Sequence, residues 1–142
     1  MVSELPERVK KWMLSFYEDN PFVKQLKIKL VKAQVGRVEM LMPIDSDFHT
    51  NVYGIAHGGA LMSLADTVMG ATCLTLNKKV VTLDFNINCI KGAPSNCSVL
   101  AIGQVIHNGA STIVVETEIV GENREFYAKA RGTFFVIEKF TT

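Results

Sequence analysis

One stretch of the chain, from His49 to Leu76, has the residue types and spacing that a chemical site would need. A loop containing histidine, asparagine and glycine leads into an apolar run that begins at Gly58. Apolar residues occupy every face of a 3.6-residue repeat there, which predicts a buried helix. Asp66 lies in the middle of this helix. An ionised carboxylate in apolar surroundings is costly unless it is paired, hydrogen-bonded or hydrated, so Asp66 needs a reason to be there.

Two interpretations of Asp66 compete. The carboxylate is either structural, satisfied by a neighbouring hydroxyl or amide, or it is a catalytic base or nucleophile held in a cleft. The other end of the helix favours catalysis, because His57-Gly58-Gly59 leaves backbone N–H groups at the positive pole of the helix dipole. Such an end suits a carbonyl oxygen that becomes an oxyanion, and Gly58 has no side chain to keep a substrate away.

The spacing of Gly58 and Asp66 has a geometric consequence. Eight residues separate them, so they lie about 12 Å apart along one helix at the usual rise of about 1.5 Å per residue. One small acyl group cannot contact both. If both act on the same bond, the helix must face a second copy of itself across a two-fold axis.

The segments around this stretch predict its scaffold. Before it come an amphipathic helix over Pro6–Tyr17, ended by Asn20-Pro21, and strands around Leu26–Lys32 and Arg37–Met42. After it come four alternating segments joined by turn sequences such as Asn108-Gly109, namely Val80–Lys91, Cys97–Val105, Thr112–Val120 and Glu125–Ile137. This order predicts a single α+β domain over residues 1–142, with an antiparallel sheet wrapped around the central helix.

The composition argues against several classes of partner. Fifteen basic and fourteen acidic residues leave almost no net charge, which argues against a nucleic-acid-binding or membrane-binding surface. No apolar run approaches the ~20 residues of a membrane span, and the N-terminus is too charged for a signal peptide, so we expect a cytoplasmic protein. The three cysteines form no CxxC pair, and the spacing of His49 and His57 matches no common ligand pattern. We therefore expect no metal and no cofactor.

Three motifs together resemble a known family. They are Asn51-x5-His57-Gly58-Gly59, Leu64-Ala65-Asp66-Thr67 on the helix, and Thr82-Leu83-Asp84-Phe85-Asn86-Ile87 on the next strand. With the order of elements, they resemble the hotdog-fold acyl-CoA thioesterases, and most of all the phenylacetate-pathway (PaaI-type) group. The resemblance covers residues 28–137.

The resemblance implies hydrolysis of an acyl-CoA thioester at the interface of a homodimer, with two dimers commonly forming a homotetramer. By motif position, Asp66 matches the acidic residue that activates water or attacks the carbonyl, and Gly58 matches the amide that polarises the thioester oxygen. Asn51 and His57 match loop positions that orient the substrate. Thr82 matches a hydroxyl that helps to position the water.

Four further residues are predicted beside the substrate. Gly59 follows the helix start, and His49 lies in the same loop as Asn51. Family members often have a basic residue just after the glycine of the turn that here contains Asn108-Gly109, where it can meet the nucleotide phosphates, but this chain has Ala110. Lys91 and Arg131 are the candidate replacements for that contact.

Two other functions remain as alternatives. Hotdog proteins also include hydratases and dehydratases that use a histidine with an acidic residue, and His57 could be such a base. The third hypothesis is an acyl-CoA-binding module without catalysis, which would bind ligand and not turn it over.

Overall fold

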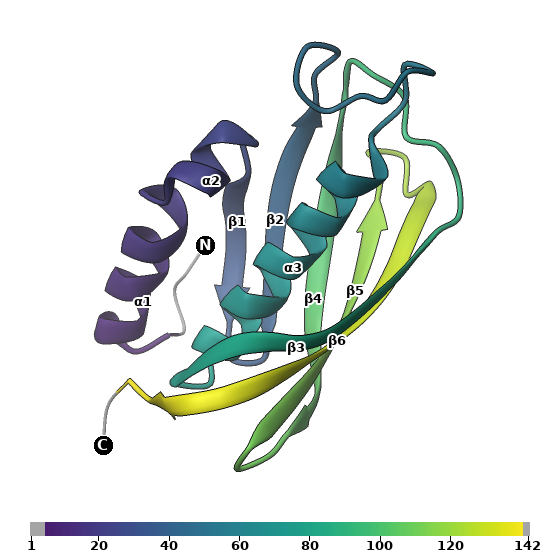
Figure 1. Cartoon of the computed structure of the whole chain (residues 1–142). Helices are drawn as coiled ribbons and strands as arrows, with labels where there is room; N and C mark the ends of the chain where they lie inside the picture. Colours follow the sequence, from purple (N-terminus) through teal and green to yellow (C-terminus); the bar gives the residue numbers. More distant parts are fainter. Residues whose placement is uncertain (1–4, 141–142) are drawn as a thin grey trace.

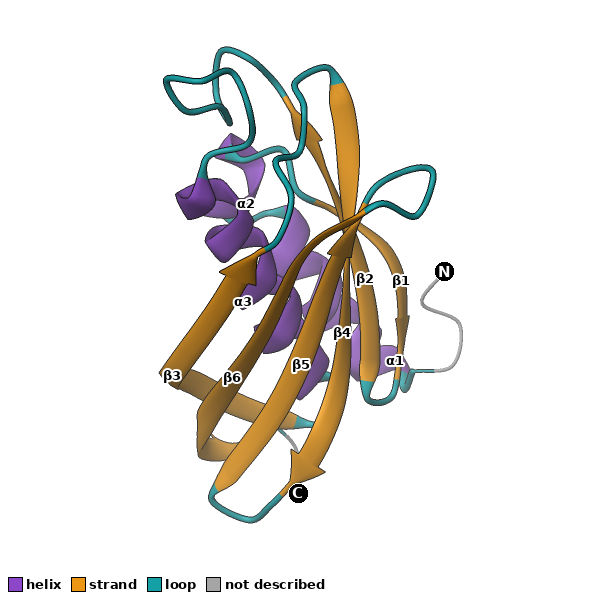
Figure 2. Ribbon diagram, turned by 90° about the vertical axis from the view of Figure 1, so that its right-hand side faces the viewer, coloured by secondary structure: helices purple, strands orange, loops and turns teal. Residues whose placement is uncertain are grey.

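The chain folds as one antiparallel sheet with helices on one face (Figures 1 and 2). A computed structural model describes residues 5–140, and residues 1–4 and 141–142 lie outside the described part. The strand order is β1-β2-β4-β5-β6-β3, with strands β1 Lys29–Gln34, β2 Arg37–Ile44, β3 Lys78–Cys89, β4 Cys97–Asn108, β5 Thr112–Val120 and β6 Phe126–Lys139. The helical elements are α1 Glu7–Met13, η1 Leu14–Glu18, α2 Pro21–Gln25 and α3 Gly58–Leu74. The predicted α+β architecture, a sheet around a long central helix, is confirmed.

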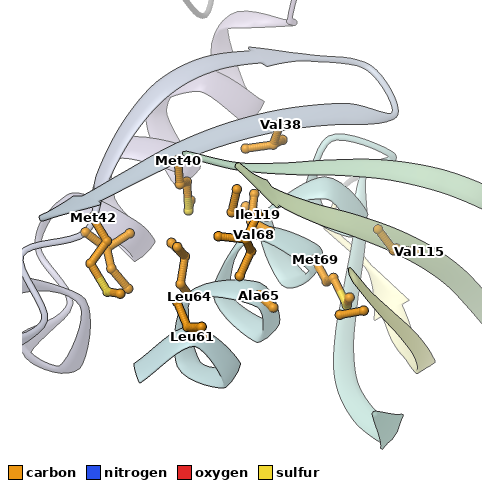
Figure 3. Packing of buried hydrophobic residues seen from close by; sticks show 14 of the residues in the cluster. Val38, Met40, Met42, Leu61, Leu64, Ala65, Val68, Met69, Val115 and Ile119 are labelled. Carbon is orange, nitrogen blue, oxygen red and sulfur yellow. The ribbon is translucent and has the colours of Figure 1, made fainter. Parts of the chain in front are cut away.

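The core lies between α3 and the face of the sheet that curves around it (Figure 3). In β2 every second residue is buried, because successive side chains of a strand point to opposite faces. Met40 and Met42 of β2 point towards Leu64 of α3 in Figure 3, and all three are fully buried. These contacts fix α3 against the centre of the sheet.

Helix α3 is not buried on all sides, so that prediction is wrong for the single chain. Met62 keeps 45% of its surface exposed, and Asp66 is also exposed. An uncovered stripe runs along the helix through Gly59, Met62, Ser63, Asp66, Thr67 and Gly70, all of them exposed or half-buried. The reason is that the sheet covers only one side of the helix. An apolar sequence predicts that a helix is buried, but it does not predict whether the same chain or another chain buries it.

The N-terminal segment differs from its prediction in detail. The predicted helix is present, but it is α-helical only to Met13 and continues as the π-helical turn η1. After it, Asn20 caps the short helix α2, with its Oδ1 accepting from the backbone N–H groups of Phe22 (2.9 Å) and Val23 (3.2 Å). Strand β1 therefore begins at Lys29, three residues later than predicted. Trp12 packs on Phe140, with ring centroids 4.5 Å apart, which ties this segment to the residue that directly follows β6.

Strand β3 forms one edge of the sheet. It is 12 residues long, and its side chains Val81 and Leu83 are 48% and 59% exposed. A long edge with exposed apolar side chains and unpaired backbone groups is a surface on which another strand can pair.

Within residues 5–140, no helix combines the length and the apolar character that crossing a membrane requires.

Candidate active site

The N-terminus of α3 is open towards solvent. His57 is its N-cap residue, with an extended backbone, and the His57 Nδ1 atom accepts a hydrogen bond of 2.9 Å from the Gly59 N–H. Gly58 is the first helical residue, so no carbonyl one turn earlier is available to accept from its N–H. Apart from its two chain neighbours and the backbone of α3, a Cβ built on Gly58 would have no atom within 4 Å. A carbonyl oxygen can therefore approach the Gly58 amide directly.

His57 is engaged in this cap. Because its Nδ1 accepts from the Gly59 N–H, the neutral ring carries its proton on Nε2. Its acceptor nitrogen is therefore not free to act as a base, and the exposed ring can only donate. The Gly59 amide, predicted beside the substrate, is likewise used by the cap.

Asp66 and Thr82 meet between the helix and the edge strand. The Thr82 hydroxyl donates a hydrogen bond of 2.8 Å to Asp66 Oδ1, and both residues are exposed in the single chain. The bond orients the carboxylate and leaves Oδ2 to other partners. The family resemblance implied one site for these two residues, and in the structure they are joined by this hydrogen bond.

Asn51 shapes the loop before α3. Its side-chain Oδ1 accepts from the backbone N–H groups of Tyr53 (2.9 Å) and Ile55 (3.3 Å). The backbone N–H of Asn51 donates to the Ile55 carbonyl at 2.8 Å. This is an Asx-type turn, in which a side chain replaces a backbone acceptor. The side-chain oxygen of Asn51 therefore holds the loop that leads to His57.

His49 requires a correction, because it lies away from any surface that a substrate could reach. It is fully buried, its Nδ1 accepts from the Asp45 N–H at 3.1 Å, and its Nε2 lies 2.7 Å from the Leu26 carbonyl oxygen, to which it donates. Both ring nitrogens are thus satisfied inside the protein, tying the loop to the end of α2. We assign His49 to loop structure and no longer to substrate binding.

Among residues 5–140, no group of three or more His, Cys, Asp or Glu side chains is placed to hold a metal ion.

Replacing His49 with alanine is expected to lower the free energy of unfolding by about 2–3 kcal/mol, because the Asp45 N–H and the Leu26 carbonyl lose their partner and a cavity remains. Thermal melting at one fixed protein concentration measures the change. His107→Ala, which removes an exposed histidine on β4, is the matched control and should change stability by less than about 0.5 kcal/mol. Equal melting temperatures for the two variants would contradict the structural role of His49.

The two predicted phosphate contacts lie in different parts of the molecule. Arg131 pairs with Glu116 through Nε at 3.1 Å, and its neighbour Ala130 is buried, so Arg131 lies on the outer face of the sheet. Lys91 follows β3 in a segment that contacts the loop before α3, where the Ala56 N–H donates to the Ala93 carbonyl at 2.8 Å. Within one chain, Lys91 follows the strand whose end leads to this loop, whereas Arg131 lies on the far side of the sheet, and contact of either with the nucleotide stays a prediction.

A pocket of about 440 Å³, which the sequence analysis missed, opens beside Asp66 and Thr82. One wall is α3, and the opposite wall contains three aromatic residues of η1 and α2, namely Phe16, Tyr17 and Phe22. The sequence signal was present as three aromatic residues in SFYEDNPF, but helical spacing alone suggested packing. Burial raises the pKa of Tyr17, and the nearby Cys73 and Asp66 raise it further, so the phenol is neutral at neutral pH.

Within one chain, the two ends of the candidate site are far apart. Residues 58–74 form one continuous helix, so the Gly58 amide and the Asp66 carboxylate are about 12 Å apart along its axis. They lie near one side of the helix but do not converge on one point.

The chain was compared with known proteins. A family model described as the thioesterase superfamily matches residues 53–128, more than half of the chain. The acyl-coenzyme A thioesterase PaaI of Escherichia coli is 28% identical over 118 residues, which cover 83% of this chain and 84% of that protein.

Solved structures agree with this match. The structure of the E. coli PaaI protein from the phenylacetic acid degradation operon superposes with a TM-score of 0.89 at 26% identity, covering 96% of this chain and 98% of that chain. A hypothetical thioesterase of Streptococcus pneumoniae, solved with coenzyme A, superposes with a TM-score of 0.76 at 28% identity, covering 79% and 90%. Two further structures of that protein are alanine variants of one aspartate and one threonine, sixteen residues apart. From the fold, the motifs and these matches, we conclude that the chain belongs to the thioesterase superfamily, as a PaaI-type hotdog thioester hydrolase.

Proposed function

We propose that the protein hydrolyses an acyl-CoA thioester to a free acid and coenzyme A, with Asp66 as general base or nucleophile. The observation that carries the proposal is the hydrogen bond from Thr82 to Asp66 at the mouth of a pocket that is partly lined by aromatic side chains. Two comparisons support it. E. coli PaaI is an acyl-coenzyme A thioesterase, and the aspartate and threonine replaced in the S. pneumoniae thioesterase have the same sixteen-residue spacing as Asp66 and Thr82.

Two routes are open to the carboxylate. As a general base, Asp66 takes a proton from water while the water oxygen attacks the thioester carbonyl, and the Gly58 N–H stabilises the oxyanion that forms. Collapse of this intermediate breaks the C–S bond, and the thiolate of coenzyme A recovers the proton. As a nucleophile, Asp66 forms a mixed anhydride, which water then hydrolyses. After a single turnover in ¹⁸O-labelled water, label on Asp66 would identify the second route with attack of water on the aspartyl carbonyl of the anhydride, and trapping of an acyl-enzyme by hydroxylamine would identify it when water attacks the acyl carbonyl.

Each site would use two chains, because Gly58 and Asp66 of one helix are too far apart to act on one carbonyl. Two antiparallel copies of α3, related by a two-fold axis near Met62, would bring Asp66 beside the partner's Gly58, since Met62 is midway between these positions. The exposed stripe of α3 consists mostly of small residues, which would allow such a close approach. The homodimer would therefore contain two equivalent sites.

The edge strand supports the same assembly. Pairing of β3 with the partner's β3 would satisfy its free backbone groups and would help to cover the exposed side chains of Val81, Leu83 and Met62. It would also shield the Asp66 carboxylate, which is exposed in the single chain, from bulk water. Association of two dimers into a homotetramer is the further expectation from the resemblance, and light scattering measures it.

A thiol-release assay across acetyl-, octanoyl-, palmitoyl- and phenylacetyl-CoA tests the proposal. We expect free thiol and free acid in equal amounts, with at least one substrate turned over. A change in enoyl absorbance without thiol release would indicate a hydratase, although the acceptor nitrogen of His57 is already occupied by the Gly59 N–H. Binding of acyl-CoA with no turnover at all would indicate a module without catalysis.

A further inference from the structure

We infer that the acyl group of the substrate occupies the pocket between α3 and the N-terminal segment 14–25, and that Gly70 and Tyr17 set how large this group can be. The inference rests on the proposed function, because the thioester carbonyl must lie at Asp66. The acyl class that we expect is uncharged and apolar. Only a group long enough to extend from Asp66 past Gly70 would be affected by the size of these two residues. Neither the matched motifs nor the comparisons assign a role to these two residues.

The pocket begins at the proposed reaction centre and ends in the core. Asp66 and Thr82 are at its exposed rim, whereas Leu74 and Phe134 at its floor are almost completely buried. Asp66, Gly70 and Leu74 follow one another at intervals of four residues, so they line one face of α3. From Asp66 to Leu74 the helix rises about 12 Å, which gives an acyl group attached at the rim a long path inwards.

The walls suit an uncharged group. Phe16, Tyr17 and Phe22 face α3 from the N-terminal segment, and the volume of about 440 Å³ lies within the range of small-molecule sites. The two lysines that also line the pocket have partners. Lys78 donates to Asn108 Oδ1 at 2.6 Å and to the Gly109 carbonyl at 2.8 Å, and Lys79 lies 3.8 Å from Glu138.

At Gly70 the two walls of the pocket are close together. A Cβ built there would lie 3.2 Å from the Tyr17 hydroxyl oxygen, and apart from atoms of α3 itself no other atom would lie within 4 Å. The absence of a side chain at Gly70 therefore keeps the path open past Tyr17. A larger residue would fill the path itself, and removal of the Tyr17 ring would widen it.

Two variants test the inference from opposite directions. Gly70→Val should lower kcat/KM for octanoyl-CoA about tenfold or more relative to acetyl-CoA, mainly through KM, because two methyl groups fill the path. Tyr17→Ala should change the profile the other way and raise the relative kcat/KM of palmitoyl-CoA. Gly70→Ala places a methyl group close to the Tyr17 hydroxyl and should have an intermediate effect on kcat/KM. Adding Tyr17→Phe in the same chain removes that hydroxyl and should reverse the effect. Both substitutions at Gly70 favour the helical state, so α3 should remain folded, which circular dichroism checks.

A binding measurement makes the test independent of turnover. Calorimetry with S-octyl-coenzyme A, a thioether that cannot be hydrolysed, and with coenzyme A gives the affinity that the octyl group adds. We expect Gly70→Val to reduce this gain at least tenfold and to leave the affinity for coenzyme A unchanged. An unchanged octyl gain in Gly70→Val and Tyr17→Ala, with both variants folded, would overturn the inference. Absence of thiol release with a normal octyl gain would instead count against the proposed hydrolysis alone.

Discussion

Replacing Asp66 with asparagine is expected to lower kcat by a factor of roughly 10³ and to leave KM within a few-fold of the parent value. An amide neither accepts a proton from water at neutral pH nor attacks a thioester, so both proposed routes are lost. In the parent, the Thr82 hydroxyl donates to Asp66 Oδ1 at 2.8 Å, and asparagine still offers an oxygen that can accept this hydrogen bond. The geometry of the site should therefore survive while its chemistry does not.

Two other variants calibrate this result. Thr82→Val removes the orienting hydrogen bond and keeps the carboxylate, so a smaller loss of about tenfold in kcat is expected, in line with one hydrogen bond to a charged group. Asp84→Asn removes an exposed carboxylate on the same strand outside the pocket and should leave kcat near that of the parent. Thiol release measures all three variants, and circular dichroism confirms their fold. An Asp66→Asn protein with near-parent turnover would mean that the carboxylate is structural.

The features that could be predicted from the sequence are those that local residues determine. The apolar run after His57 predicted the start of α3 at Gly58, because the glycines and the histidine cap are next to one another in the chain. The turn residues Asn108-Gly109 predicted the β4–β5 connection, which the structure confirms. The family resemblance implied that Asp66 and Thr82 share one site, and the folded chain shows that a hydrogen bond joins them.

The features that were missed depend on distant contacts. His49 looked like a site residue because it lies in the same loop as Asn51, but its ring is fixed by the Leu26 carbonyl, 23 residues earlier. The position of Arg131 likewise depends on a distant contact, because the register that pairs it with Glu116 puts it on the outer face of the sheet. Asp66 was expected in apolar surroundings, but the sheet of its own chain does not cover that face of α3.

Mixing two inactive variants is expected to restore about a quarter of the parent activity, because each site would combine residues of two chains. One variant is Asp66→Ala, which lacks the carboxylate. The other is Gly58→Val, whose side chain would fill the open space in front of the helix start, where nothing but the adjacent residues and the backbone of α3 lies within 4 Å of a built Cβ. Gly58 is a better choice than Asn51, because the Asn51 side chain holds the loop through two hydrogen bonds and its loss would disturb the fold.

The restored fraction follows from the way two defects are distributed over a dimer. When the variants are unfolded together and refolded, random pairing makes half of the dimers mixed. In a mixed dimer with shared sites, one site receives both defects and the other receives neither, so a quarter of all sites are intact. If each site belonged to one chain, no site would be intact in any dimer. Each variant must first be inactive and correctly assembled by itself, and mass spectrometry must detect the mixed dimers. An inactive mixture that contains those dimers would reject the two-chain site, and Gly58 would then need a role within its own chain.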